Sequence, residues 1–79
     1  MKKLSPVILA DLVASKRKEK SMTQQALAEA TGINRALISR IEKQDFIPSI
    51  PQLEQLGEVL GFEPDSVFAD TAHDRLPSP

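Results

Sequence analysis

Basic and small polar side chains recur between residues 35 and 43 at the spacing that places them on one side of a helix. Ala36, Ser39, Arg40 and Lys43 stand at positions i, i+3, i+4 and i+7, and Arg35 opens the segment. An arginine fork can bond O6 and N7 of guanine together, which provides roughly 1–3 kcal/mol of discrimination between bases. A methyl side chain can contact thymine, and a hydroxyl can bond a base or a phosphate. Arg35, Ala36, Ser39 and Arg40 therefore predict base contacts in the major groove of DNA, although both arginines can also be read as ordinary solvated helix charges.

A second set of residues has the chemistry to bind the DNA backbone. Thr23 and Gln24 stand where a helix is expected to begin, and free backbone N–H groups at a helix N-terminus favour phosphate. Asn34 is expected to begin the next helix, and Lys43 lies just past that helix's end. We predict phosphate contacts from all four. Thr23 also serves as a helix cap, and Gln24 has a simpler interpretation as a helix-forming surface residue.

Helix caps and turn residues divide the first half of the chain into three expected helices. The first begins at Ser5-Pro6 and ends near residues 18–20, with cations in its last turn. The second begins at Thr23 and ends at Gly32, because glycine accepts the left-handed conformation of a tight exit. The third begins at Asn34, with Ile38 and other apolar residues on its inner side.

The second half of the chain predicts two more helices and a tail. Ser49 caps the fourth helix, whose leucines at 53, 56 and 60 form one stripe, and Gly57 allows close approach there. A short fifth helix is expected from residue 63, and it contains Val67 and Phe68. No strand pattern is recognisable. We expect an all-α domain of residues 1–69, followed by a flexible polar tail of residues 70–79.

Composition indicates one small domain with an uneven distribution of charge. The 79 residues carry a net charge of −1 and no cysteine. Nine Lys and Arg face four acids in residues 1–43, whereas seven acids face one Arg in residues 44–79. A local basic half of this kind suits a phosphate partner. No apolar run approaches the ~20 residues that cross a bilayer, and no signal peptide is recognisable, so we expect no membrane contact and a cytoplasmic location.

Catalytic and metal-binding patterns are missing from the sequence. The only histidine, His73, lies in the expected tail, and there is no cysteine or glycine-rich phosphate loop. The carboxylates of the expected fourth helix are spread over an acidic surface. We therefore expect no enzyme activity, no catalytic residue, no metal and no cofactor.

The helical motif resembles the lambda-repressor-like, Xre-type helix-turn-helix family of phage and bacterial regulators. The likeness runs from Met22 to about Phe68, with residues 9–20 fitting the family's first helix. The positions that carry it are Thr23, Gln24, Gln25, Leu27, Ala28, Gly32, Ile33, Ile38, Ser39, Ile41 and Glu42, followed by Pro48-Ser49 and Leu60-Gly61.

The resemblance implies a compact five-helix lambda-repressor-like fold in which the second and third helices form the helix-turn-helix and the third reads DNA. It implies twofold dimers on near-palindromic operators, a phosphate contact from Gln24, and an ion pair of Arg17 with Glu42 that ties the first helix to the third. Gln44 departs from the family's usual glycine, which predicts a strained or altered exit from the third helix. Leu37 and Ala36 replace polar side chains that many members have at those positions.

Several apolar residues near the C-terminal end have two possible uses. In so small a domain some must belong to the core, and others can form the self-complementary patch of a twofold dimer. We predict an interface made from this set: Ile47, Phe62, Val67 and Phe68. Phe46 remains open between burial and a contact with DNA or protein.

Together these features predict a transcription regulator that binds double-stranded DNA as a homodimer. Repression is favoured over activation, because no effector or activating domain is recognisable. Two alternatives stay open. One is an antitoxin-type regulator that also binds a toxin, and the other is a helical protein-interaction module that has lost DNA binding.

Overall fold

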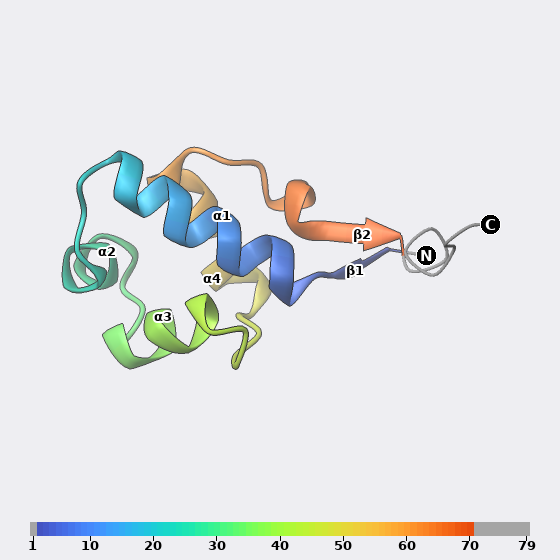
Figure 1. Cartoon of the computed structure of the whole chain (residues 1–79), viewed down its shortest axis with the longest axis horizontal. Helices are drawn as coiled ribbons and strands as arrows, with labels where there is room; N and C mark the ends of the chain where they lie inside the picture. Colours follow the sequence, from blue (N-terminus) through green and yellow to red (C-terminus); the bar gives the residue numbers. More distant parts are fainter. Residues whose placement is uncertain (1, 71–79) are drawn as a thin grey trace.

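The structure is a computed structural model that describes residues 2–70, and in that range four α-helices carry most of the chain. Figure 1 shows them packed around one another, with a small two-stranded sheet extending from one end. In chain order the elements are β1 (Lys2–Leu4), α1 (Pro6–Glu19), α2 (Gln24–Thr31), α3 (Arg35–Glu42), α4 (Ile50–Leu60), the 3-10 helix η1 (Pro64–Val67) and β2 (Phe68–Asp70).

Each α-helix begins at the cap that the sequence predicts. The side chains of Ser5, Thr23 and Asn34 accept backbone N–H groups in the first turns of α1, α2 and α3. Ser49 caps α4 in a full capping box, since the Gln52 side chain also accepts the Ser49 N–H at 2.9 Å. These bonds satisfy donors that a helix start leaves unpaired, so local sequence fixes where the helices begin.

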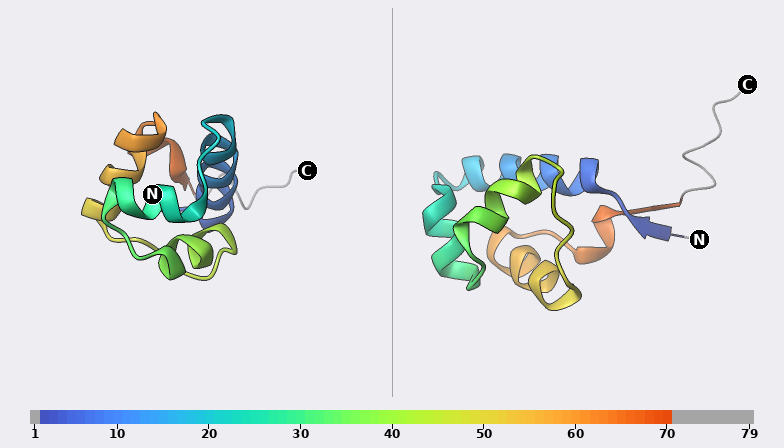
Figure 2. Two further views of the ribbon diagram at one scale, coloured as in Figure 1. Left: turned by 90° about the vertical axis from the view of Figure 1, so that its left-hand side faces the viewer. Right: turned by 90° about the horizontal axis from the view of Figure 1, so that it is seen from below.

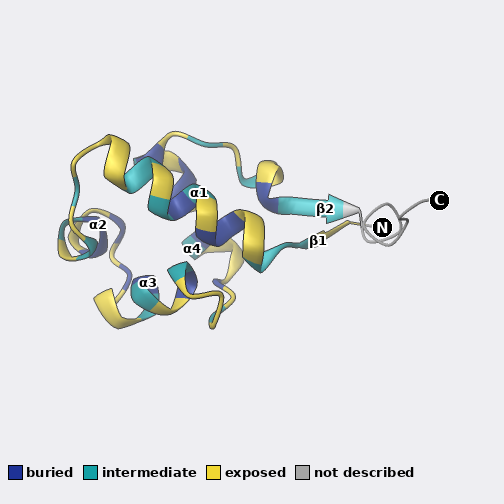
Figure 3. Ribbon diagram, in the orientation of Figure 1, coloured by how far each residue is buried: buried dark blue, intermediate teal, exposed yellow. Residues whose placement is uncertain are grey.

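The core lies where the four helices face one another. The buried residues lie on the inward sides of the helices (Figure 3). The stripe of α4 is confirmed, because Leu53, Leu56 and Leu60 are at most 1% exposed. The largest fully buried side chains are Leu9, Val13, Leu27, Ile38, Ile41, Leu53, Leu56, Leu60 and Val67.

The expectation that the chain holds no strand is wrong. β1 and β2 pair antiparallel, with Lys2 opposite Asp70 and Leu4 opposite Phe68. The Ser5 N–H extends this contact by donating to the carbonyl of Val67 at 2.7 Å. Strands of three residues are too short to show an alternating pattern, and their pairing depends on where the helices bring the two ends. β2 includes Asp70, and the other residues of the predicted tail, with His73, lie outside the described range.

The five-helix count is also corrected. The predicted fifth helix is the 3-10 turn η1, and the chain then continues as β2 at Phe68. Val67 is 0% exposed and belongs to the core, so its predicted place at a dimer interface is wrong. Phe62 and Phe68 are partly buried against the core, whereas Ile47 is 51% exposed.

Gly57 allows α4 to contact the segment that follows it. A Cβ atom at this position would lie 2.6 Å from the carbonyl oxygen of Phe62. The backbone returns this closely because Gly61 takes a left-handed conformation (φ 86°) and the Phe62 N–H donates to the Gly57 carbonyl. Within residues 2–70, no helix has both the length and the apolar character needed to cross a membrane.

Candidate nucleic-acid interface

The turn between α2 and α3 is fixed by a glycine and a buried threonine. Gly32 has φ 76°, and its N–H donates to the Ala28 carbonyl at 2.8 Å. The Thr31 hydroxyl donates to the Leu27 carbonyl at 2.8 Å and accepts the Ile33 N–H at 3.2 Å. Ile33 is buried and anchors the turn. The sequence analysis did not identify Thr31, because no local pattern reveals that its hydroxyl bridges both sides of the turn.

α3 has one buried side and one exposed side, as the spacing of its residues predicts. Ile38 is 0% exposed and Ile41 is 1% exposed. On the other side, Arg35, Ala36 and Arg40 are exposed. Seen from below, α3 lies on the near side of the molecule with α2 beside it (Figure 2, right). Its outer side is therefore open to a large partner.

Ser39 and Lys43 complete this outer side in different ways. Ser39 is half-buried, so it is less accessible than its neighbours. Lys43 is exposed and forms the C-cap of α3. We call the exposed or partly exposed residues Arg35, Ala36, Ser39, Arg40 and Lys43 the α3 ridge.

A nearly buried ion pair fixes the C-terminal end of α3, as the family resemblance implied. Arg17 Nε donates to Glu42 Oε2 at 2.8 Å, and its Nη2 donates to Oε1 at 3.1 Å. The two side chains are only 13% and 11% exposed. Hydrogen bonding to Glu42 raises the pKa of Arg17, against the lowering effect of burial, so the guanidinium stays charged. Its Nη1 also donates to the Met22 carbonyl at 2.9 Å, which ties the segment before α2 to the same pair.

The residues predicted to meet phosphate occupy three helix ends. Thr23 and Asn34 are exposed caps, and their oxygens accept the N–H groups of Ala26 (2.9 Å) and Ala36 (2.7 Å). Gln24 is half-buried, and its Nε2 donates to Glu42 Oε1 at 3.2 Å. Gln24 therefore joins the Arg17–Glu42 ion pair, through a contact that sequence reasoning missed because it links residues 18 apart.

Arg40 lies against the loop that follows α3. Its Nε donates to Asp45 Oδ2 at 3.3 Å, and its Nη2 donates to the Asp45 carbonyl at 3.1 Å. Its guanidinium carbon stands 5.7 Å from the centre of the Phe46 ring, which is partly buried against the core. The loop turns back because Gln44 takes φ 64°, the left-handed conformation that glycine adopts more readily than other residues.

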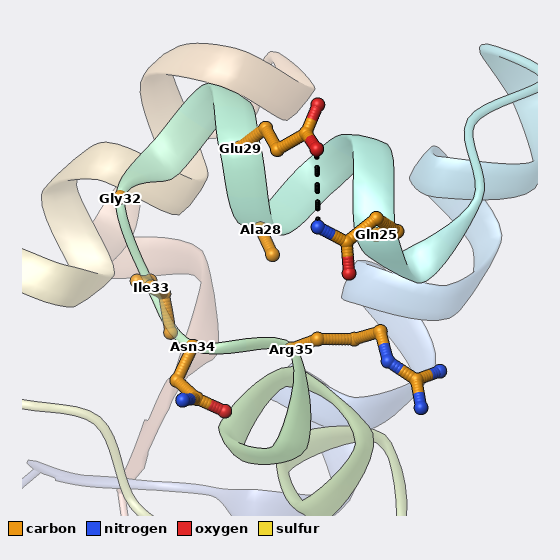
Figure 4. A pocket seen from close by; sticks show the side chains of 7 residues that line it. All are labelled: Gln25, Ala28, Glu29, Gly32, Ile33, Asn34 and Arg35. Carbon is orange, nitrogen blue, oxygen red and sulfur yellow. Dashed lines mark hydrogen bonds between the residues drawn. The ribbon is translucent and has the colours of Figure 1, made fainter.

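A shallow hollow separates the outer sides of α2 and α3 (Figure 4). Gln25 and Glu29 stand on the α2 wall, where Gln25 Nε2 donates to Glu29 Oε2 at 3.1 Å. Arg35 stands on the α3 wall. The hollow is open to solvent and faces the start of the ridge. Within residues 2–70, no group of three or more His, Asp or Glu residues is placed to hold a metal ion.

The fold matches known helix-turn-helix proteins. A helix-turn-helix family model matches residues 13–67, well over half of the chain. The restriction-modification controller protein C.AhdI from Aeromonas hydrophila is 24% identical with a TM-score of 0.71, over 80% of this chain and 96% of that one. A hypothetical transcription factor, NHTF, from Neisseria is 19% identical with a TM-score of 0.72, over 91% and 88%.

A third solved structure, the SinR protein/SinI protein complex, holds a chain 31% identical with a TM-score of 0.70, over 89% of this chain and 68% of that one. No curated protein sequence matches. The family match spans α2, the Gly32 turn, α3 and α4, which are the elements that position the ridge. The chain therefore belongs to the lambda-repressor-like, Xre-type helix-turn-helix family of DNA-binding regulators.

Proposed function

We propose that this regulator is a sequence-specific repressor that acts by occupying an operator, with α3 in the major groove. The observation that carries the proposal is the rigid presentation of the α3 ridge. Ile38 and Ile41 anchor the inner side of α3 in the core. Asn34 caps the start of the helix, and the nearly buried Glu42 fixes its end. A helix held at both ends can present side chains to base edges without a further ordering cost.

The proposed contacts divide by chemistry. Arg35 and Arg40 supply forks for guanine, Ala36 supplies a methyl group for thymine, and Ser39 supplies a hydroxyl. The backbone contacts come from Thr23, Gln24, Asn34 and Lys43. The bond from Gln24 to Glu42 is compatible with this role, since a side-chain amide has two N–H donors.

We further propose a cytoplasmic homodimer on a near-palindromic operator. Two copies of α3 would enter successive major grooves about 34 Å apart. With Val67 in the core, the proposed interface is reduced to Ile47, Phe62 and Phe68. Ile47 is the most accessible of the three and is the residue on which to test the dimer. Ile47→Ser should lower the dimer fraction in sedimentation velocity, and an unchanged fraction would remove Ile47 from the interface.

Salt dependence of DNA affinity tests the proposed function. The binding of a random-sequence duplex is measured by fluorescence anisotropy at two salt concentrations. The logarithm of the affinity should fall with the logarithm of salt by about 0.9 per phosphate contact. Lys43→Ala should reduce that slope by about one unit, whereas Gln55→Ala, an exposed change on α4, should leave it unchanged. Weak binding with an affinity that does not change with salt concentration would contradict the proposal.

A second candidate is a regulator that also binds a partner protein, as an antitoxin does. Two observations favour it. The neighbour with 31% identity was solved in a complex of two proteins. The large apolar side chains of Val7, Ile8, Ile47 and Ile50 are 39–59% exposed in this chain. Apart from Asp70, the predicted tail that would fold on such a partner lies outside the described residues. Retention of full DNA binding but loss of partner capture in Val7→Ser would support this candidate.

A further inference from the structure

Asp45 provides two of the contacts that hold the guanidinium of Arg40. Its carboxylate accepts from Nε at 3.3 Å, and its own carbonyl accepts from Nη2 at 3.1 Å. The Asp45 N–H returns a bond of 2.7 Å to the Arg40 carbonyl. Asp45 of the loop and Arg40 of α3 are thus joined by both main-chain and side-chain hydrogen bonds, although neither side chain is buried.

The pattern of these bonds uses one edge of the arginine fork. Nε and Nη2 point toward the same side of the planar guanidinium, and that edge faces Asp45. The other donor pair, Nη1 with the outer hydrogen of Nη2, lies at the end of the fork. Among residues 2–70, the Nη1 of Arg40 makes no hydrogen bond, and the side chain is 52% exposed. A guanine that offers O6 and N7 accepts such a free pair of donors.

The Phe46 ring restrains the plane of the same group. The guanidinium carbon lies 5.7 Å from the ring centre, within the distance of a cation–π contact. The ring packs against the core, so it is a firm support. An arginine ordinarily loses much rotamer freedom when it binds, and two supports reduce that loss before DNA arrives.

We propose that Asp45 is a specificity-determining residue of this DNA interface, which acts by holding one edge of Arg40 so that the free end of the fork meets a guanine. Asp45 is a positioning residue, because it acts through Arg40. The inference rests on the proposed function and names a determinant of it outside the α3 ridge.

Removing the Asp45 side chain should change DNA affinity and base discrimination in different directions, which separates positioning of Arg40 from simple electrostatics. An aspartate beside a polyanion disfavours binding to every DNA sequence. Removing it should therefore leave affinity for random DNA equal or higher. If Asp45 orients Arg40, its removal should at the same time reduce discrimination at the base pair that Arg40 contacts.

The test measures base discrimination in five proteins: wild type, Arg40→Ala, Asp45→Ala, Asp45→Asn and the double Arg40→Ala/Asp45→Ala variant. The probe is a duplex that the wild type selects from a random oligonucleotide pool, together with variants that change one base pair at a time. Asp45 is 70% exposed, so its variants should fold, and circular dichroism checks this. The asparagine variant keeps an oxygen that accepts from Nε while it removes the charge.

Arg40→Ala should abolish a guanine preference at one or two positions of each half-site. Asp45→Ala should reduce the preference at the same positions by about tenfold, within the range of a single bidentate contact. Asp45→Asn should retain most of the preference, and Asp45→Ala should change no preference in the Arg40→Ala background.

Three results would overturn the inference. Full wild-type discrimination in Asp45→Ala would show that Arg40 needs no support from Asp45. An equal change on every DNA sequence would show that the residue acts only through its charge. A loss at positions that Arg40→Ala does not affect would show that Asp45 acts by another route. In all three cases the proposed function stands, whereas a wild type without any base preference would overturn both.

Discussion

Arg17 and Glu42 form a two-point ion pair, at 2.8 and 3.1 Å, that joins α1 to the last residue of α3. Both side chains are close to buried. The pair therefore sets the position of the α3 ridge relative to the rest of the domain. Its partners Gln24 and Met22 extend the same contact to the start of α2.

Arg17→Met should lower the free energy of unfolding by about 2–3 kcal/mol, because it leaves a nearly buried carboxylate without its cation. Urea denaturation followed by circular dichroism measures this. The matched control is Lys16→Met, which removes a 3.9 Å pair with Glu19 that is much more exposed. The control should cost at most about 0.5 kcal/mol. Equal losses in the two variants would show that the Arg17 pair is not specially stabilising.

Gln44→Gly should raise the free energy of unfolding by about 0.5–1 kcal/mol. A non-glycine residue in the left-handed region is destabilised by roughly 1–2 kcal/mol, and glycine relieves this strain. Part of the gain is offset because glycine has more conformational freedom in the unfolded state. Gln44 is exposed and has φ 64°, so no contact in the core is lost.

The neighbouring Lys43→Gly is the control for Gln44→Gly. Lys43 has φ −96°, which any residue adopts, so glycine there should lower stability by about 0.5–1 kcal/mol. Thermal denaturation of both variants gives the comparison. A destabilised Gln44→Gly would mean that the left-handed turn carries no strain that glycine relieves.

Gly57→Ala should lower the free energy of unfolding, although alanine is usually preferred to glycine in a helix by about 1 kcal/mol. The added methyl group would stand 2.6 Å from the Phe62 carbonyl oxygen, a backbone atom that must move. Overpacking of this kind costs about 1–3 kcal/mol. Gln55→Ala, exposed on the same helix, should be close to neutral. If Gly57→Ala were stabilised, the backbone at Phe62 would be able to move away from the added methyl group at little cost.

Arg35→Ala should relax base preference at one position of each half-site, with a loss of about 1–3 kcal/mol of discrimination there. Lys43→Ala should instead weaken all sequences alike, because a phosphate contact carries no base information. Competition binding with single-base variants of a selected duplex distinguishes the two. Uniform weakening in Arg35→Ala would assign Arg35 to the DNA backbone.

The features that the sequence predicts well are local ones. Ser5, Thr23, Asn34 and Ser49 each bond an N–H two or three residues away, so their chemistry alone identifies the helix starts. The stripe of α4 is equally local, because its leucines repeat with the helix period.

The features that escape prediction depend on where distant segments meet. β1 and β2 join the two ends of the described chain, and neither strand is long enough to reveal itself. Val67 was predicted at a dimer interface, but the 3-10 turn and the backbone bond from Ser5 bring it into the core. The bond from Arg40 to Asp45 depends on the left-handed conformation of Gln44, which lies between them in the loop. Side-chain periodicity does not predict that turn.

Selection of bound duplexes from a random oligonucleotide pool by the wild-type chain tests most directly the proposal that the α3 ridge reads base edges. We predict strong enrichment of a near-palindromic site with guanines in each half-site and half-site centres about one helical turn, roughly 34 Å, apart. Repeated rounds that enrich no sequence above the starting pool, with binding intact, would contradict it.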